Sequence, residues 1–213
     1  MSAWGVTSAL VAGMVVAVVV LLVGERWGRR RLVLAAKPAA SAMFLAIGWV
    51  LLRPGDPYGA WVLVALVLCL AGDVLLMFPR AFGAGLASFL LGHVAYIVAF
   101  HTLRPAASWP IVWSVPIVTA SVLATGWLLP HLGRMRGPVV AYVAVITVMV
   151  WGALSVGLAR PGSTRIVAGA VLFYLSDLSV ARDRFVHRGF VNRAWGLPAY
   201  YLGQLCLALS VAG

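Results

Sequence analysis

The chain has 213 residues, of which 63% are hydrophobic and only 10% are charged. Because about a quarter of the residues of a soluble domain are charged, this composition excludes an ordinary soluble protein and predicts a membrane protein. The formal net charge of +11 does not indicate nucleic-acid binding. The basic residues cluster in short loops between apolar stretches, as topology signals and lipid-headgroup contacts do.

Eight apolar stretches are each long enough to cross a bilayer, which takes about 20 residues per helix. The connections between them are short and often contain Pro, Gly or Arg, and none reads as a domain linker. We therefore expect an all-α fold, a bundle of eight transmembrane helices in a single transmembrane domain, 1–213. The predicted helices cover residues 4–23, 32–52, 60–78, 84–103, 109–129, 138–159, 164–181 and 194–212.

The loop charges predict the orientation of this bundle. The odd-numbered loops hold eleven arginines, whereas the even-numbered loops hold four. Because cytoplasmic loops carry the excess of Lys and Arg, we expect the odd loops in the cytoplasm and both termini outside the cell membrane. The odd-loop arginines are Arg26, Arg29, Arg30, Arg31, Arg80, Arg134, Arg136, Arg182, Arg184, Arg188 and Arg193.

A weak internal repeat accompanies this pattern. Asp73 and Asp177 are each followed by a phenylalanine, a glycine and then another helix. Proline also lies near the start of the second and the sixth stretch, in Lys37-Pro38 and Gly137-Pro138. The two halves would then form a parallel repeat of four helices each. The alternative is chance similarity among apolar segments.

Two aspartates lie inside apolar stretches, Asp73 in CLAGDVLLMF and Asp177 in VLFYLSDLSV. A carboxylate near the bilayer centre costs roughly 2.5–3.5 kcal/mol on insertion scales, so such a residue indicates a functional site. Together with the one lysine, Lys37, both are predicted within roughly 10 Å of the cytoplasmic interface. We expect the two carboxyls to face one cavity. The alternative is that they pair with Lys37 or loop arginines only to fix helix packing.

Other polar side chains enter the same half of the bundle, and we expect them to line that cavity or support it. Lys37 precedes Pro38, which disfavours α geometry and predicts a helix start or break there; the alternative is a lysine that snorkels. Tyr174 lies three residues before Asp177, where it is placed to hydrogen-bond that carboxyl. The further candidates are His93, Tyr96, Tyr142, Tyr200 and Gln204.

Several familiar kinds of site have no signature in this chain. The histidines and acids lack metal-ligand spacing, and no nucleophile elbow, Walker loop or dinucleotide fingerprint occurs. We therefore expect neither a metal nor a cofactor. The two cysteines, Cys69 and Cys206, lie in apolar runs, and we expect buried free thiols.

Short motifs along nearly the whole chain resemble the YhhN family, whose members are eight-helix membrane proteins. The motifs are Lys37-Pro38, Gly72-Asp73, Phe89…Gly92-His93…Tyr96, Phe173-Tyr174-Leu175-Ser176-Asp177 with a following Phe185, and Gln204. The resemblance implies hydrolysis of the vinyl ether bond of lysoplasmalogens, which are single-chain membrane lipids. The products would be a fatty aldehyde and glycerophosphoethanolamine or glycerophosphocholine.

The residues suit that chemistry. Protonating the outer carbon of a vinyl ether gives an oxocarbenium ion, and glycosidases handle such an ion with two carboxyls. We expect Asp73 and Asp177 to act as acid and as base or stabiliser, in an order that the sequence leaves open. His93 would orient an aspartate or the water, and Lys37 or a cytoplasmic arginine would bind the phosphate. Paired membrane acids also suit a proton-coupled transporter or lipid carrier, which would move its substrate without cleaving it.

Overall fold

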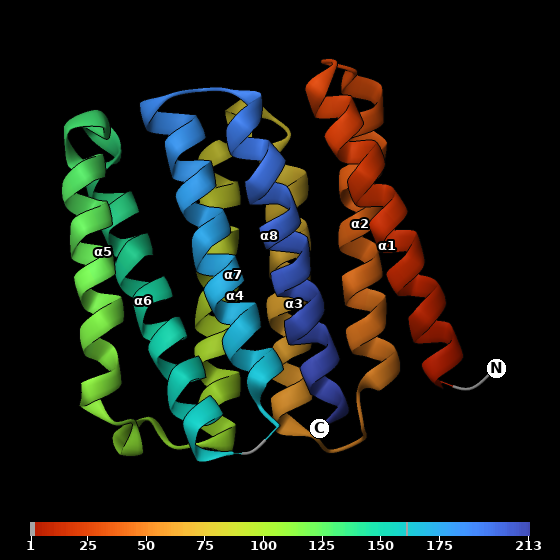
Figure 1. The fold of residues 1–213 in the computed structure, drawn as a ribbon, viewed down its shortest axis with the longest axis vertical. Helices are drawn as coiled ribbons and strands as arrows, with labels where there is room; N and C mark the ends of the chain where they lie inside the picture. Colours follow the sequence, from red (N-terminus) through yellow and green to blue (C-terminus); the bar gives the residue numbers. More distant parts are fainter. Residues whose placement is uncertain (1–2, 161) are drawn as a thin grey trace.

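The computed structural model describes residues 3–160 and 162–213, and these residues form eight long helices and no strand (Figure 1). Seven of the described helical segments are long and apolar enough to cross a membrane, so the predicted fold class, a multi-pass helical membrane bundle, is confirmed. The helices are α1 (Ala3–Arg26), α2 (Arg30–Leu51), α3 (Pro57–Leu76), α4 (Phe82–Leu103), α5 (Ser114–Leu128), α6 (Arg136–Ala159), α7 (Thr164–Ala181) and α8 (Phe190–Leu209).

The remaining long helix, α8, is less apolar because it carries Asn192, Arg193 and Gln204. Two of these side chains, Asn192 and Gln204, are buried. The helix packs against α1, α2, α3 and α7. Its polar groups therefore face protein rather than lipid, which is the arrangement that a bilayer requires.

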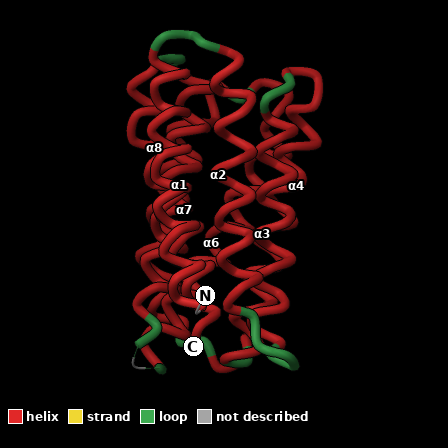
Figure 2. The backbone as a smooth tube through the Cα atoms, turned by 90° about the vertical axis from the view of Figure 1, so that its right-hand side faces the viewer, coloured by secondary structure: helices red, strands yellow, loops and turns green. Residues whose placement is uncertain are grey.

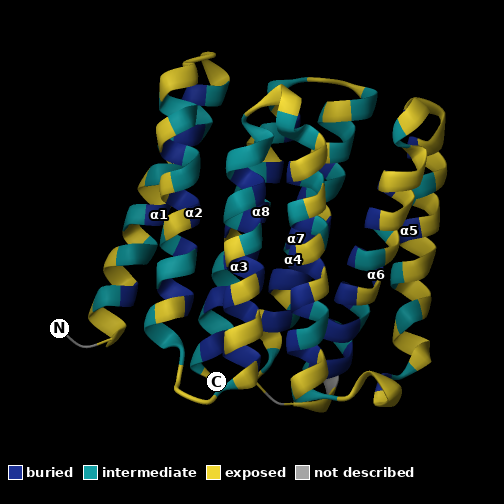
Figure 3. Cartoon of the chain, turned by 180° about the vertical axis from the view of Figure 1, so that it is seen from behind, coloured by how far each residue is buried: buried dark blue, intermediate teal, exposed yellow. Residues whose placement is uncertain are grey.

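The bundle is built from pairs of neighbouring helices. Pair α1/α2 lies at one edge, pair α5/α6 lies at the other, and α3, α4, α7 and α8 fill the centre (Figure 1). The loops gather at the two ends of the bundle (Figure 2). Both termini lie at one end and the four odd-numbered loops at the other. Buried residues concentrate in the central helices, whereas α1 and α5 are largely exposed, as expected of helices that contact lipid (Figure 3).

Two local predictions are wrong. The second helix neither begins nor breaks at Lys37, because α2 runs from Arg30 to Leu51 with Pro38 inside it. Proline removes one backbone hydrogen bond, and neighbouring helices make this tolerable in a membrane. The fifth helix begins at Ser114 rather than at 109. Two 3-10 turns precede it, because Pro110 holds Trp109 out of the helical region.

The helix contacts bear on the predicted parallel repeat. If the first four helices correspond to the last four, α2 corresponds to α6 and α4 to α8. Helix α2 packs against α8, and the corresponding helix α6 packs against α4. Helices α3 and α7, which carry the two membrane aspartates, also pack against α2 and α6 respectively. This is the pairing that two equivalent halves would produce, and the repeat itself stays a prediction.

Candidate active site

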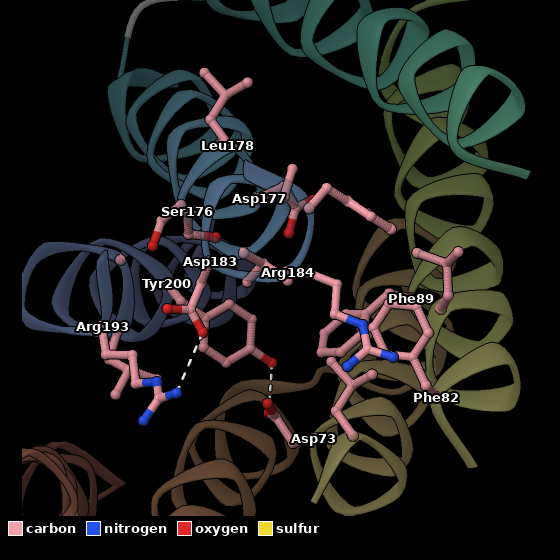
Figure 4. Close-up of a pocket in the computed structure, with 18 of the residues that line it drawn as sticks. Asp73, Phe82, Phe89, Ser176, Asp177, Leu178, Asp183, Arg184, Arg193 and Tyr200 are labelled. Carbon is pink, nitrogen blue, oxygen red and sulfur yellow. Dashed lines mark hydrogen bonds and ion pairs between the residues drawn. The ribbon is translucent and has the colours of Figure 1, made fainter. Parts of the chain in front are cut away.

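A cavity of about 400 Å³ lies between the helices toward the end that carries the odd-numbered loops. Both membrane aspartates line it, Asp73 from α3 and Asp177 from α7. Figure 4 shows their side chains entering the same space from opposite sides. The remaining wall is mostly apolar, with Tyr200 beside Asp73 and several charged residues at the mouth.

Asp73 is buried and is surrounded by groups that favour its ionised form. Lys37 Nζ lies 3.2 Å from Oδ1. Ser41 Oγ donates to Oδ2 at 2.8 Å, and the Tyr200 hydroxyl donates to the same oxygen at 2.6 Å. A buried carboxylate is tolerated only where a cation and hydrogen-bond donors replace its lost water. The ammonium of Lys37 and the hydroxyls of Ser41 and Tyr200 supply these groups around Asp73.

Asp177 has a different environment, with no lysine or arginine paired to it among the described residues. The Tyr142 hydroxyl donates to Oδ2 at 2.8 Å. His93 Nε2 lies 3.4 Å from the same oxygen. The Asp177 side chain is 20% exposed and that of His93 only 1%, so the carboxyl faces the cavity while the imidazole stands behind it.

The hydrogen bonding of His93 shows where its proton lies. Nδ1 is 2.6 Å from the carbonyl oxygen of Phe89, and a carbonyl can only accept, so Nδ1 carries a hydrogen. In a neutral ring Nε2 would then point a lone pair at Asp177. Nε2 is buried and has no hydrogen-bond partner among the described residues. A proton on either Nε2 or Oδ2 would turn this 3.4 Å approach into a hydrogen bond.

Aromatic rings hold the His93 imidazole in place beside Asp177. The His93 ring centroid lies 4.4 Å from that of Phe173 and 5.2 Å from that of Tyr142. Phe89 also packs edge-on against Phe173 and Tyr200. These rings close the inner wall of the cavity and keep bulk water from the imidazole.

The structure brings most of the predicted residues together, but not all. Tyr142 and Tyr200 each bond a membrane aspartate. The prediction that Tyr174 bonds Asp177 is wrong: the Tyr174 hydroxyl instead lies 3.1 Å from Ser121 Oγ of the neighbouring helix α5. Tyr96 and Gln204 bond each other at 2.7 Å and are absent from the cavity lining.

Sequence reasoning missed two groups of residues. Ser41 lies four residues after Lys37 on the same helix face, and that spacing was a usable signal. The other group is the charged mouth of the cavity: the sequence predicts that Lys37 or a cytoplasmic arginine binds the phosphate, but it does not identify which arginines line the cavity. The mouth is formed by Glu25, Arg30, Asp183, Arg184, Arg188 and Arg193.

The sequence profile of the YhhN family matches residues 32–211. Over 159 residues the chain is 35% identical to "Lysoplasmalogenase TMEM86B" of Rattus norvegicus, covering 74% of this chain and 64% of that protein. Over 162 residues it is 34% identical to "Lysoplasmalogenase" of Mycobacterium bovis, covering 72% of this chain and 59% of that protein.

A bacterial relative is matched over more of its length. The chain is 25% identical over 179 residues to "Uncharacterized membrane protein YhhN" of Escherichia coli, covering 82% of this chain and 85% of that protein. The rat and mycobacterial relatives are longer, and this chain covers less than two thirds of the length of each. No solved structure matches.

Proposed function

Because the chain belongs to the YhhN family, we propose that it is a membrane-embedded hydrolase that cleaves the vinyl ether bond of lysoplasmalogens. The names of the rat and mycobacterial relatives support this substrate. The observation that carries the proposal is the pair of unlike carboxyls in one membrane cavity: Asp73 is paired with a lysine, and Asp177 faces a histidine.

In this proposal Asp177 is the proton donor. A proton shared by Asp177 and His93, whose Nε2 lies 3.4 Å from Oδ2, would lie beside the cavity, where it can be delivered to a substrate carbon. His93 acts through Asp177 as a positioning residue, because it is buried behind the carboxyl and does not line the cavity. Donation by a positioned acid of this kind accelerates a reaction by typically about 10²–10⁴-fold.

Asp73 is the stabilising carboxylate. Its contacts with Lys37, Ser41 and Tyr200 keep it ionised across the cavity from Asp177. A fixed negative charge that needs no reorganisation stabilises a positive charge developing in the transition state. The division of roles follows the general rule that two carboxyls in unlike surroundings serve as acid and as ionised partner.

The reaction then balances with water as the other reactant. Asp177 protonates the outer vinyl carbon, and the inner carbon becomes an oxocarbenium ion facing Asp73. Water adds its hydroxyl to that carbon while its proton passes to Asp177, which restores the acid. The resulting hemiacetal transfers its hydroxyl proton to the glyceryl oxygen as the carbon–oxygen bond breaks. The products are a fatty aldehyde and a glycerophospho-alcohol.

The hydrocarbon tail has an apolar route out of the cavity. Apart from Tyr142, the side chains of α5 and α6 that line the cavity are aliphatic. A single chain lying there would continue into the lipid around α5, which is largely exposed. These residues are Ala124, Leu128, Val139, Val143 and Ile146.

The proposal is tested by incubating the purified protein with a lysoplasmalogen in uncharged detergent and measuring aldehyde release. Stoichiometric aldehyde and glycerophospho-alcohol are expected, with no product from the saturated alkyl ether analogue, which lacks the double bond to be protonated. If no lysoplasmalogen yields aldehyde, the hydrolase assignment fails. The two acids would then be interpreted as the coupling pair of a carrier.

We also propose that the protein lies in the cell membrane with the odd-numbered loops in the cytoplasm. Those loops share one end of the bundle (Figure 1) and hold most of the arginines. In intact cells, a membrane-impermeant maleimide is expected to label Arg160→Cys but not Arg31→Cys or Arg134→Cys. Wild type, with buried Cys69 and half-buried Cys206, reports background labelling. Efficient labelling of Arg31→Cys in intact cells would reverse the orientation.

A further inference from the structure

The last step of the proposed reaction, breakdown of the hemiacetal, moves a proton between two oxygens bonded to the same carbon. A direct transfer would close a small ring of carbon, oxygen, hydrogen and oxygen, in which the O–H···O angle is strongly bent. Hydrogen bonds weaken steeply below about 120°, so this direct route is slow. Most of the cavity wall is apolar, so a side chain rather than bulk water is needed to carry the proton.

The Tyr200 hydroxyl lies where such a proton carrier is needed. Tyr200 lines the cavity from α8, and its hydroxyl donates to Asp73 Oδ2 at 2.6 Å. Figure 4 shows this pair across the cavity from Asp177. An O–H···O⁻ contact of roughly 2.5–2.7 Å is typical of a strong charge-assisted hydrogen bond. A proton therefore has a short path between the oxygens of Tyr200 and Asp73.

The other two donors to Asp73 are less suited to carry the proton. Ser41 Oγ lies 2.8 Å from Oδ2, but Ser41 is absent from the cavity lining. Lys37 lines the cavity, yet its Nζ contacts Oδ1 at the longer distance of 3.2 Å and balances the charge of the carboxylate. A buried ion pair that loses one charge is strongly destabilised. Tyr200 can exchange a proton with Asp73 while that ion pair stays in place.

Packing fixes the Tyr200 ring and leaves its hydroxyl able to turn. The ring centroid lies 5.5 Å from that of Phe173, 5.9 Å from that of Phe89 and 6.3 Å from that of Phe44. All three contacts are edge-on, an arrangement that aromatic pairs prefer. The ring is thus held on several sides, whereas the O–H bond rotates about the C–O bond. The hydroxyl can point either at Asp73 or at an oxygen inside the cavity.

We infer that Tyr200 is a further catalytic residue, which protonates the glyceryl oxygen as the hemiacetal breaks down while Asp73 receives the hemiacetal proton. This inference rests on the proposed function, which places the inner carbon of the vinyl ether opposite Asp73. The glyceryl oxygen is bonded to that inner carbon, so it lies on the Tyr200 side of the cavity. Asp177 faces the outer carbon instead.

This proton transfer balances without any further reactant. The Tyr200 hydroxyl turns to the glyceryl oxygen and gives it a proton, and the carbon–oxygen bond breaks with its electron pair going to that oxygen. The turn vacates an acceptor site on Asp73 Oδ2, which takes the proton of the hemiacetal hydroxyl. The electron pair of that O–H bond becomes the second bond of the aldehyde carbonyl. The proton on Oδ2 then crosses 2.6 Å to the Tyr200 oxygen, and both side chains regain their starting charge.

The two chemical stages can be followed separately in a single turnover. A lysoplasmalogen with an NMR-active carbon isotope at the inner vinyl carbon is mixed with excess purified protein in uncharged detergent and frozen at intervals. Carbon NMR of the frozen samples distinguishes vinyl ether, hemiacetal and aldehyde at that position. In wild type, aldehyde is expected to appear as fast as the vinyl ether disappears.

Tyr200→Phe keeps the ring and its packing and removes only the hydroxyl. The variant is expected to slow vinyl ether loss about tenfold, the scale of one hydrogen bond to a charged group, because Asp73 loses one donor. Hemiacetal breakdown is expected to slow further, at least about 100-fold, the scale for a positioned acid. Labelled hemiacetal should therefore accumulate before aldehyde appears.

Tyr201→Phe is the matched control. It removes the hydroxyl of the adjacent tyrosine, which contacts Ser41 Oγ and the backbone carbonyl of Lys37 but is absent from the cavity lining. Its aldehyde release is expected to keep pace with vinyl ether loss, as in wild type.

Aldehyde release that also keeps pace with vinyl ether loss in Tyr200→Phe would overturn the inference, because the Tyr200 hydroxyl would then only support the charge of Asp73. Hemiacetal that accumulates equally in Tyr201→Phe would overturn it as well. In both cases the wild-type protein still releases aldehyde, so the proposed function stands. A wild-type protein that releases no aldehyde overturns the proposed function and the inference together.

Discussion

Asp177→Asn is expected to lower the rate of aldehyde release at least about 100-fold, the scale for loss of a positioned general acid. Asparagine keeps the shape of the side chain and can still accept from the Tyr142 hydroxyl, but it has no titratable proton to give. The loss should appear in kcat rather than in KM, because proton transfer is made only in the transition state. Initial rates of aldehyde formation over a range of lysoplasmalogen concentrations measure both parameters.

Asp73→Asn is the matched variant in the same cavity, and infrared spectroscopy distinguishes its role from that of Asp177. Asp73→Asn and Asp177→Asn should both be inactive. Only Asp177→Asn should also remove the infrared carbonyl band of a protonated carboxyl that contacts His93. His93→Gln should slow the reaction less than Asp177→Asn and should alter the same signal. An Asp177→Asn protein that is folded and retains more than a tenth of wild-type activity would contradict the assignment of Asp177 as the acid.

Lys37→Met is expected to lower the free energy of unfolding by roughly 3–5 kcal/mol, the cost of removing one partner of a buried ion pair. The lysine side chain is 15% exposed and that of Asp73 3%, so little water is available to replace the ammonium. Ser41 and Tyr200 would still donate to the carboxylate, but two hydroxyls do not neutralise its charge. Thermal or denaturant unfolding in a fixed detergent measures the change.

The double variant Lys37→Met with Asp73→Asn is the control for this effect. Removing both charges leaves no uncompensated carboxylate, so much of the lost stability should return. Arg31→Met, at the exposed start of the same helix, should shift the unfolding free energy by no more than about 0.5 kcal/mol. If the double variant is less stable than Lys37→Met alone, the ion pair is not the source of the loss.

The fold class and the two aspartates of the candidate site follow from the sequence alone. Apolar stretches of about 20 residues can cross a bilayer only as helices, because lipid offers no partners to an open backbone. Acids are costly in such stretches, so Asp73 and Asp177 were conspicuous in a single sequence. The short motifs around them also predicted the family, which the profile match confirms.

The difference between the two aspartates depends on how the helices pack. Asp73 and Asp177 look alike in sequence, yet one contacts Lys37 and the other contacts His93. Those partners come from α2 and α4, and side-chain contacts between helices depend on helix rotation and crossing, which a local pattern does not specify. The course of α2 through Pro38, which turns Lys37 toward Asp73 rather than toward the interface, was likewise decided by packing.

The positions of the arginines in the odd-numbered loops also depend on tertiary packing. Their number predicted an orientation, because that signal depends only on which loop holds a charge. Which of them enter the cavity depends on the π-helical turn after α7 and on the pairing of Arg193 with Glu25, 168 residues away in the chain. A contact over that separation forms only when the ends of the chain fold against each other, so a single sequence read locally does not reveal it.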